Sequence, residues 1–322
     1  MYAHGWYQLA FADELEDGVT PLEFGTRPLI AIKSEEGIRV ADAACPHRGA
    51  HLGFGGELEG NFIRCPFHHH RICIGADNAA RLKIREYEVI EMGGMVFARL
   101  SDQETTDLPR ALREIDRDYQ FAKGFSLQVA TNIEMVMENG FDRTHFKAVH
   151  GLVSVPKLDL VDSEDGALKV RGDFQIPRSS WGAGTQNLGP VVAEYRARAF
   201  SPGLVIAELQ GEEPYDYKII TAAVPNKDMQ TCSVRLSIAL PRGEEPEPNV
   251  HFVAALADAS REGLELDRAI WDHLIEVEDQ FIPELDREVM AFAEFCKPFR
   301  AGQSPTVASA PAYYPTTALR SR

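Results

Sequence analysis

Two short cysteine–histidine motifs constrain this chain more than any other feature. The first motif places Cys45 two residues before His47, and the second places Cys65 three residues before His68. Each motif offers one thiolate and one imidazole, so together they supply two sulfur and two nitrogen ligands for a metal centre. Whatever the chain folds into must therefore bring two loops together around one centre.

The order of the ligands distinguishes two kinds of centre. Zinc fingers usually group cysteine with cysteine and histidine with histidine, whereas here the two residue types alternate. Alternation suits two parallel loops whose cysteines converge on a buried iron and whose histidines converge on an outer one, as in a Rieske [2Fe–2S] centre. We therefore predict a Rieske cluster held by Cys45, His47, Cys65 and His68, with zinc as the alternative.

Length, charge and cysteine content restrict the class of protein. The 322 residues are enough for two domains, and the net charge of -16 argues against binding nucleic acid or an anionic membrane surface. The five cysteines follow no disulfide spacing. We find neither a signal peptide nor an apolar run near the ~20 residues that a membrane helix needs. These features lead us to expect a soluble, cytoplasmic protein.

The pattern of apolar residues divides the chain into two domains. Residues 1–105 show short strands separated by glycine-containing turns, which predicts a small all-β domain with the cluster at one tip. Residues 106–122 are charged and form the expected linker. Residues 123–322 combine alternating apolar strands with long helical patterns. The sequence thus predicts an α+β chain whose second domain is an antiparallel sheet packed by helices.

A second group of possible metal ligands lies in a predicted helix from Met135 to His150. It reads Asp142-x-x-His145-x-x-x-x-His150. On a regular α-helix, five residues correspond to about 140° of rotation, which would point the two imidazoles apart. Both can face one metal only if the helix is loosened or if His150 lies at its end. The alternative is that both are ordinary surface histidines.

The two motifs together resemble the catalytic subunit of Rieske non-haem iron oxygenases. This resemblance implies a helix-grip, START-like catalytic domain in which His145 and His150 bind a mononuclear Fe(II) that uses O₂ as co-substrate. It also implies that Asp142 is a catalytic bridge, linking an iron-ligand histidine to the Rieske histidine of a neighbouring subunit. Members of this family assemble head to tail, so the resemblance predicts a ring-shaped homotrimer.

The remaining iron ligand should be a carboxylate from the C-terminal helical region. We favour Asp279, because it shares an apolar stripe with Trp271 and Ile275 and precedes the helix-breaking Pro283 by four residues. The segment around Asp279 also resembles the one that carries this ligand in related oxygenases. The other candidates are acidic residues of the same region: Asp267, Asp272, Glu276, Glu278, Glu284 and Asp286.

The expected activity follows from these centres. The chain has no dinucleotide fingerprint, so electrons should come from a separate reductase or ferredoxin. The reaction should be hydroxylation, as mono- or dioxygenation, of a small and largely apolar substrate, with demethylation or desaturation as alternatives at the same iron. An electron carrier or a ligand-binding protein without oxygenase activity is a further alternative. Four apolar residues near the iron motif are candidates for the substrate pocket: Phe141, Phe146, Val149 and Leu152.

One departure from the family pattern concerns the second cluster loop. Rieske oxygenases commonly continue their Cys-Pro-x-His motif with glycine and tryptophan, and here His69 and His70 stand in those places. Their role is open between surface residues and residues that adjust the cluster.

Overall fold

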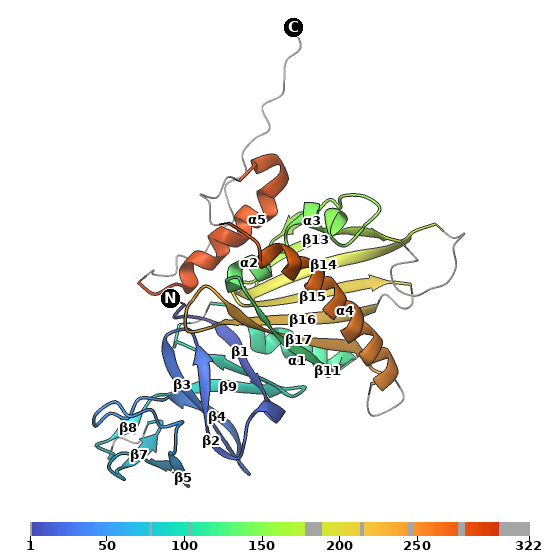
Figure 1. Cartoon of the computed structure of the whole chain (residues 1–322). Coiled ribbons are helices and arrows are strands. Elements are labelled where there is room, and N and C mark those ends of the chain that lie inside the picture. The colour runs from blue at the N-terminus through green and yellow to red at the C-terminus, as the bar shows by residue number, and fades with distance from the viewer. Residues whose placement is uncertain are drawn as a thin grey trace.

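The computed structural model describes residues 2–76, 79–103, 105–177, 189–212, 216–243, 248–275 and 281–302. A β-rich N-terminal part lies below a larger part in which helices cover a broad sheet (Figure 1). This arrangement confirms the predicted α+β class, with a small all-β domain followed by an antiparallel sheet and helices. Among the described helices, none is long and apolar enough to cross a membrane.

The N-terminal part consists of two small sheets. The six-stranded sheet has the order β1-β10-β9-β4-β3-β2 and the four-stranded sheet the order β5-β6-β7-β8. The larger sheet contains β1 (Trp6–Phe11), β2 (Gly18–Phe24), β3 (Arg27–Ser34), β4 (Gly37–Asp42), β9 (Glu86–Met92) and β10 (Met95–Arg99). The smaller sheet contains β5 (Glu57–Glu59), β6 (Phe62–Arg64), β7 (Arg71–Ile74) and β8 (Lys83–Ile84). The 3-10 turn η1 (Ala12–Glu14) follows β1. The short strands and glycine-containing turns predicted for residues 1–105 include the hairpins β3–β4 and β9–β10.

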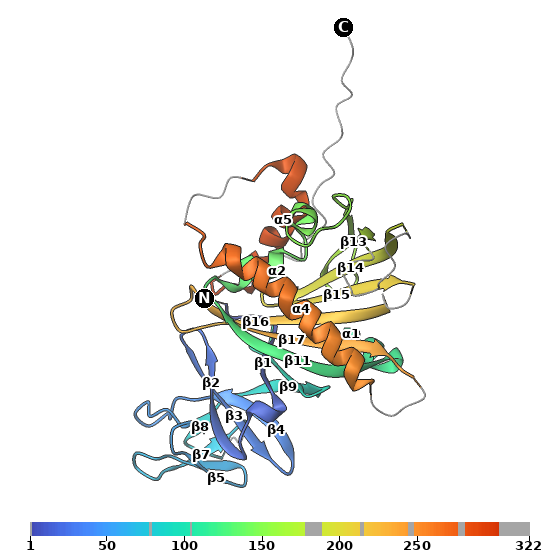
Figure 2. The same ribbon diagram turned by 45° about the vertical axis from the view of Figure 1, so that its right-hand side comes forward.

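The C-terminal part is built on a seven-stranded sheet with the order β11-β17-β16-β15-β14-β13-β12. All of its neighbouring strands run antiparallel. Its strands are β11 (Tyr119–Val129), β12 (Asp159–Val161), β13 (Leu168–Ile176), β14 (Val191–Ser201), β15 (Leu204–Gly211), β16 (Asp216–Pro225) and β17 (Cys232–Pro241). The long helix α4 (Val250–Trp271) lies across this sheet (Figure 2).

Alternation along the strands gives the sheet two buried faces. On β15, Val205 belongs to the large core cluster that includes Leu256 of α4. The flanking Leu204 and Ile206 belong to another cluster, which includes Leu112 of α1 (Leu108–Asp118). Successive side chains of a strand point to opposite faces, so α4 and α1 cover opposite sides. The segment 106–122, which was predicted as a linker, contains the whole of α1 and the start of β11.

One long helical prediction was wrong in its continuity. The stretch predicted as one helix from Met135 to His150 forms α2 (Ile133–Glu138) and α3 (Arg143–Ala148). The predicted C-terminal helical region forms α4 and then α5 (Pro283–Cys296), which starts at the helix-breaking Pro283. The 3-10 turn η3 (Lys297–Phe299) follows α5. Proline at the first turn of α5 suits a helix start, because its missing N–H would have no partner there.

The two parts share an interface of ion pairs and apolar contacts. Glu14 of η1 pairs with Arg235 of β17 at 2.9 Å, and Asp13 pairs with Lys123 of β11 at 2.6 Å. The largest core cluster contains residues of both parts, including Tyr7 and Leu236. The two cysteine–histidine loops are thus carried on a domain that packs against the seven-stranded sheet.

Candidate metal centres and the cavity beside them

The two cysteine–histidine loops adopt the same backbone geometry. In the first loop, the N–H of Cys45 donates to Ala50 O at 2.8 Å and the N–H of Gly49 donates to Cys45 O at 2.8 Å. In the second, Cys65 N–H donates to His70 O and His69 N–H donates to Cys65 O, both at 2.9 Å. The two loops thus share a hydrogen-bonded turn that starts at the cysteine, and each carries its histidine within that turn.

Burial separates the two types of ligand in these loops. Cys45 and Cys65 belong to the buried core, whereas His47 and His68 are exposed and their ring centroids lie 4.8 Å apart. Burial raises the pKa of the Cys45 thiol, and the backbone N–H groups of His47 and Arg48 that donate to the sulfur oppose this. Hydrogen bonds to sulfur of this kind stabilise thiolate ligands. The donor set therefore fits a cluster with an inner cysteine side and an outer histidine side.

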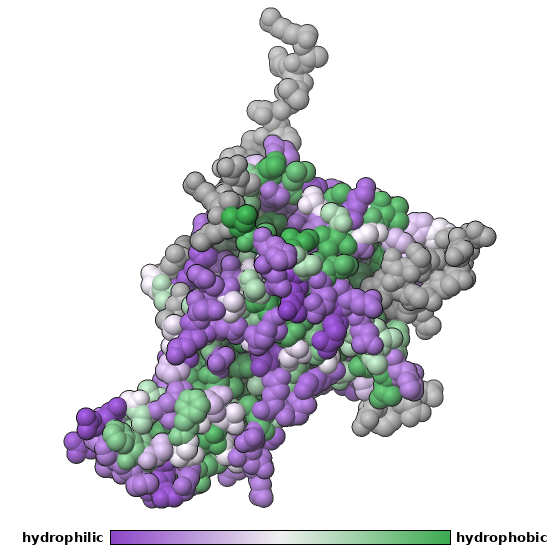
Figure 3. Space-filling view, in the orientation of Figure 1, coloured by the Kyte–Doolittle hydropathy of each residue, from purple (hydrophilic) through white to green (hydrophobic). Residues whose placement is uncertain are grey.

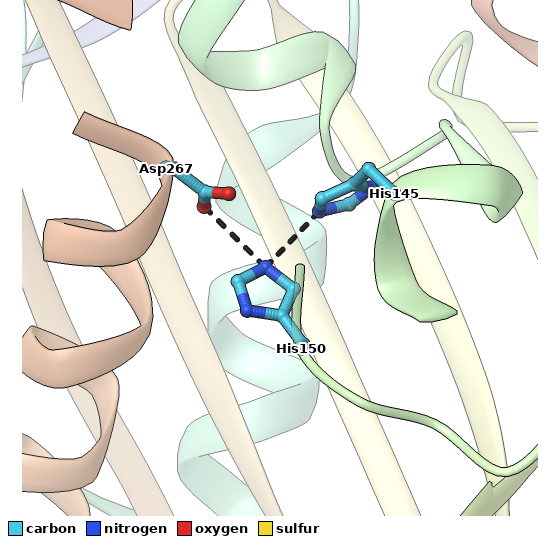
Figure 4. Close-up of side chains that lie close together, drawn as sticks. All are labelled: His145, His150 and Asp267. Carbon is cyan, nitrogen blue, oxygen red and sulfur yellow. Dashed lines mark hydrogen bonds and ion pairs between the residues drawn. The ribbon is translucent and has the colours of Figure 1, made fainter. Parts of the chain in front are cut away.

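The second group of ligands brings two predicted residues together with a third. His145 Nε2 lies 3.2 Å from His150 Nε2, which lies 3.4 Å from Asp267 Oδ2 (Figure 4). One ligand atom from each of these residues lies within 4.8 Å of the other two. Two imidazoles and one carboxylate form the donor set of non-haem Fe(II) oxygenases.

The break between α2 and α3 explains how His145 and His150 converge. Asp142 is the N-cap of α3, and its Oδ1 accepts from the N–H groups of Thr144 at 2.8 Å and His145 at 3.3 Å. The helix ends at Ala148, so His150 lies beyond it and is free of the helical rotation. On a regular helix, the five-residue spacing would point the two imidazoles apart. Because α3 is too short to include both residues, His150 can turn toward His145.

Local contacts orient His145 for metal binding. Its Nδ1 lies 2.6 Å from the carbonyl oxygen of Asp142. When Nδ1 donates to this carbonyl, Nε2 is left unprotonated and faces His150, as a metal ligand requires. Burial also lowers the pKa of His145, which favours the neutral ligand form. In this structure the carboxylate of Asp142 caps α3, while its backbone orients the neighbouring histidine.

The structure brings a different acid to the histidines than the one we favoured. Asp267 lies on α4 and is buried, with 6% of its surface exposed. A buried carboxylate needs a compensating partner. The two imidazoles lie close enough to Asp267 for all three side chains to bind the same metal ion. Asp279 lies outside the described residues, as do Glu276 and Glu278. Asp267 was among the sequence candidates, and its signal was the apolar stripe that it shares with Trp271 one turn later.

A cavity of about 380 Å³ adjoins these three residues. Of the predicted pocket residues, Phe146, Val149 and Leu152 line it. Phe141 lies outside the lining and stacks on Phe292 with 5.1 Å between ring centroids. Most of the lining is apolar, and its volume lies within the roughly 300–1,000 Å³ range of ligand sites. The cavity can therefore hold a small apolar molecule against the metal donors.

Part of the cavity wall is a packed aromatic group that the sequence did not reveal. The rings of Phe174 and Tyr195 stack at 4.2 Å, and Phe146 packs against both of them. The Tyr195 hydroxyl donates to Gly140 O at 2.9 Å. The ring is thus held by stacking on Phe174 and by the hydrogen bond of its hydroxyl. Because Phe174 and Tyr195 come from β13 and β14, far along the chain from the iron motif, no local pattern connects them with it.

The cavity reaches the surface beside the end of α4. Leu266 lines the cavity and is 52% exposed. Figure 3 shows apolar residues gathered over the upper part of the molecule, where α3, α5 and the end of α4 lie in Figure 1. An apolar molecule could therefore enter along a surface of similar polarity.

Comparisons with known proteins agree with this geometry. Residues 5–85 match the family model of the Rieske [2Fe-2S] domain, and residues 101–294 match that of the 3-ketosteroid 9alpha-hydroxylase C-terminal domain. The oxygenase component of a 3-ketosteroid-9-alpha-monooxygenase from Rhodococcus rhodochrous is 23% identical over 92% of this chain and 80% of its own length. Cholesterol 7-desaturase nvd from Bombyx mori is 32% identical over 46% of this chain. That alignment covers only 36% of the desaturase, and the one with the Drosophila melanogaster desaturase covers 38% of it.

Solved structures show the same fold. NdmB of Pseudomonas putida CBB5 has a TM-score of 0.66 at 19% identity, over 91% of this chain and 89% of its own. Dicamba monooxygenase bound to 3,6-dichlorosalicylic acid has a TM-score of 0.65 at 16% identity, over 92% of this chain and 97% of its own. Together, the two matched family models and the arrangement of both ligand groups show that the chain belongs to the Rieske non-haem iron oxygenases, with a C-terminal domain of the 3-ketosteroid 9α-hydroxylase family.

Proposed function

We propose that this chain is a terminal oxygenase component that hydroxylates a small, largely apolar organic substrate. It would use O₂ and electrons that a separate protein supplies. The observation that carries this proposal is the group formed by His145, His150 and Asp267, whose ligand atoms lie within 4.8 Å of one another beside an apolar cavity. This arrangement offers a metal three protein ligands and keeps a substrate next to it.

The two donor sets would hold the family's two cofactors. Cys45, His47, Cys65 and His68 would hold the [2Fe–2S] cluster, and His145 and His150 the mononuclear iron. We propose Asp267 as the carboxylate ligand in place of Asp279, because Asp267 is buried and points at His150 (Figure 4). When bound, the iron supplies O₂ activation, which no protein side chain can perform.

The contribution of the chain is ligation, orientation and exclusion of water. The carbonyl of Asp142 holds the His145 ring so that Nε2 faces the other donors. The apolar lining keeps bulk water from the reacting substrate and strengthens electrostatic interactions within the site. We retain the proposal that the Asp142 side chain also links the iron site to the cluster of a neighbouring subunit. Its partly buried position at the start of α3 supports this role.

The proposal also covers the domain division and the partners. The cluster domain would comprise residues 1–105, the linker residues 106–122 and the catalytic domain residues 123–322. A reductase or ferredoxin would donate electrons at the exposed histidine side of the cluster. The working assembly would be a homotrimer, as the resemblance to the family implies. We place it in the cytoplasm because the five cysteines follow no disulfide spacing, which suits a reducing compartment.

Desaturation is the second candidate reaction. The 32% identity with a cholesterol 7-desaturase favours it over demethylation. Both reactions would use the same ligands and cavity, and mass spectrometry of the product separates them. Hydroxylation adds one oxygen atom to the substrate, whereas desaturation removes two hydrogen atoms.

The test of the proposed site is Asp267→Ala, compared with Asp279→Ala and with the control Asp272→Ala on the same helical region. We expect Asp267→Ala to lose the mononuclear metal and to lower turnover at least about 100-fold, since even groups that only orient a ligand contribute 10–100-fold. The visible and EPR spectra of the cluster should stay unchanged. Full activity in Asp267→Ala together with loss in Asp279→Ala would restore Asp279 as the ligand. Zinc without iron in the purified protein would refute the oxygenase proposal.

A further inference from the structure

The buried face of α4 carries a serine where helical periodicity favours an apolar side chain. Leu256, Asp267 and Trp271 are the buried residues of this helix. Ser260 lies four residues after Leu256 and seven before Asp267. With 3.6 residues per turn, its side chain leaves the helix within about 40° of both. Ser260 therefore lies on the side of α4 that faces the sheet, the side from which Asp267 reaches His150.

The hydroxyl of Ser260 is buried without a hydrogen-bond partner. Its Oγ is closed to water, and no described residue donates to it or accepts from it. A serine inside a helix can bond back to the carbonyl four residues earlier, but the Ser260 hydroxyl makes no such bond. Because a buried hydroxyl without a partner is destabilising, a ligand that supplied the partner would gain affinity from it.

Ser260 and Asp267 line the same cavity at different points along α4. Seven residues of α-helix correspond to a rise of about 10 Å. Asp267 lies beside His150 (Figure 4), so Ser260 is two helical turns away from the proposed metal ligands. A molecule that fills the cavity can therefore meet the metal site with one end and the serine with the other.

Contacts with the sheet show that the cavity also runs across the strands. Phe146, which follows His145, packs against β13. Arg261, which follows Ser260, lies over the ring of Phe125 on β11, with 4.1 Å between the guanidinium carbon and the ring centroid. Four strands separate β11 from β13 in the sheet. The serine and the iron-binding histidine thus belong to opposite sides of the cavity.

We propose that Ser260 is a specificity-determining residue whose hydroxyl binds an oxygen atom at the end of the substrate that lies away from the metal. The inference rests on the proposed oxygenase function and describes how the same cavity selects its substrate. The hydroxyl can donate to a carbonyl or accept from an alcohol. A substrate with this oxygen satisfies the buried hydroxyl, whereas a pure hydrocarbon leaves it without a partner.

The test compares the binding of two probes of similar shape, 4-phenylcyclohexanone and phenylcyclohexane, which differ in one carbonyl oxygen. Tryptophan fluorescence reports the binding, because Trp271 lines the cavity. We expect the wild type to bind the ketone more tightly than the hydrocarbon. Ser260→Ala should reduce this preference about 5- to 10-fold, the effect of one hydrogen bond between uncharged groups. It should also raise the melting temperature of the free protein, because it removes a buried hydroxyl without a partner.

Ser237→Ala is the matched control. The Oγ of Ser237 on β17 is also buried without a partner, but Ser237 does not line the cavity. This variant should keep the wild-type preference for the ketone. Ser260→Thr and Ser260→Val form a second pair, since threonine and valine have nearly the same shape and differ in the hydroxyl. Of these two, Ser260→Thr should show the stronger preference for the ketone.

A wild type that binds both probes equally, or neither, would overturn the inference. An unchanged preference in Ser260→Ala, or an equal loss in Ser237→Ala, would overturn it as well. Equal preferences in Ser260→Thr and Ser260→Val would show that the space at this position matters and the hydroxyl does not. Turnover plays no part in these measurements, so their failure leaves the oxygenase proposal standing. The metal test with Asp267→Ala can in turn fail without changing the binding ratios.

Discussion

His69 carries a backbone strain that its counterpart in the other cluster loop avoids. Gly49 and His69 both follow their loop's cysteine by four residues, and their φ values are +76° and +56°. Glycine adopts this left-handed conformation without cost, whereas other residues pay roughly 1–2 kcal/mol. The position that is commonly glycine in related oxygenases thus has a left-handed backbone in this chain. The histidine in this chain tolerates the geometry rather than changing it.

We therefore predict that His69→Gly stabilises the cluster domain by about 1 kcal/mol, since it relieves the left-handed strain. Thermal unfolding of the cluster-loaded protein, followed through the cluster absorbance, measures the effect. Gly49→Ala is the matched opposite change and should destabilise the first loop. His70→Gly should bring no gain, because His70 does not have a positive φ. A less stable His69→Gly variant would show that the imidazole itself makes a stabilising contact.

At the scale of elements, the iron site depends on contacts that fix the short helix α3. Arg143 Nε donates to Leu285 O at 3.3 Å and so connects α3 with the start of α5. Tyr195 of β14 donates to Gly140 O in the turn that precedes Asp142. Because an isolated helix of six residues is not stable, these contacts with the sheet and with α5 determine where His145 points.

We predict that Tyr195→Phe destabilises the fold by about 1 kcal/mol, the net value of one hydrogen bond, and weakens metal binding about 10-fold. The aromatic wall would remain, so KM should change little. Tyr119→Phe is the control, since the Tyr119 hydroxyl donates to Asp216 at 2.8 Å in a contact outside the cavity lining. It should lose similar stability with unchanged affinity for Co²⁺. Equal Co²⁺ affinity in both variants would contradict a positioning role for Tyr195.

At the scale of the whole molecule, the ion pair between Glu14 and Arg235, which joins the two parts, depends on pH. Burial acts to raise the pKa of Glu14, but the Phe11 N–H and the Arg235 guanidinium outweigh it and hold the pKa below its ordinary value of 4.5. A group whose pKa is lowered on folding stabilises the protein above its unfolded pKa. This contribution is complete above about pH 4.5 and is lost as the pH falls through the lowered value.

We predict that Glu14→Gln costs about 2 kcal/mol at pH 7, the typical value of a hydrogen bond to a charged group. The difference from the wild type should shrink as the pH falls below about 4.5, because the wild-type carboxyl then becomes neutral too. Urea unfolding at a series of pH values measures both curves. A difference that stays constant down to pH 3 would show that Glu14 acts through its shape and not its charge.

The sequence by itself determined the chemistry of both centres and the class of the fold. Cysteine and histidine at fixed short spacings specify their metal geometry locally, because a loop of four residues leaves few ways to present two ligands. The hairpins β3–β4 and β9–β10 were equally local, since glycine turns between alternating apolar strands define them. The link from the two motifs to an oxygenase family followed from their combination.

The tertiary structure alone decided which residues gather around His145 and His150 and which line the cavity beside them. The side chains that join His145 there come from other elements: Asp267 from α4, Phe174 from β13 and Tyr195 from β14. Helical periodicity placed several acids on plausible faces, and only the packing of α4 across the sheet brought Asp267 to His150. The break between α2 and α3 was also hidden, because the capping by Asp142 and the contacts with β14 and α5 outweigh local helix propensity. The pattern of residues along the chain indicates local secondary-structure preference, whereas the geometry of the site depends on which helices and strands pack together.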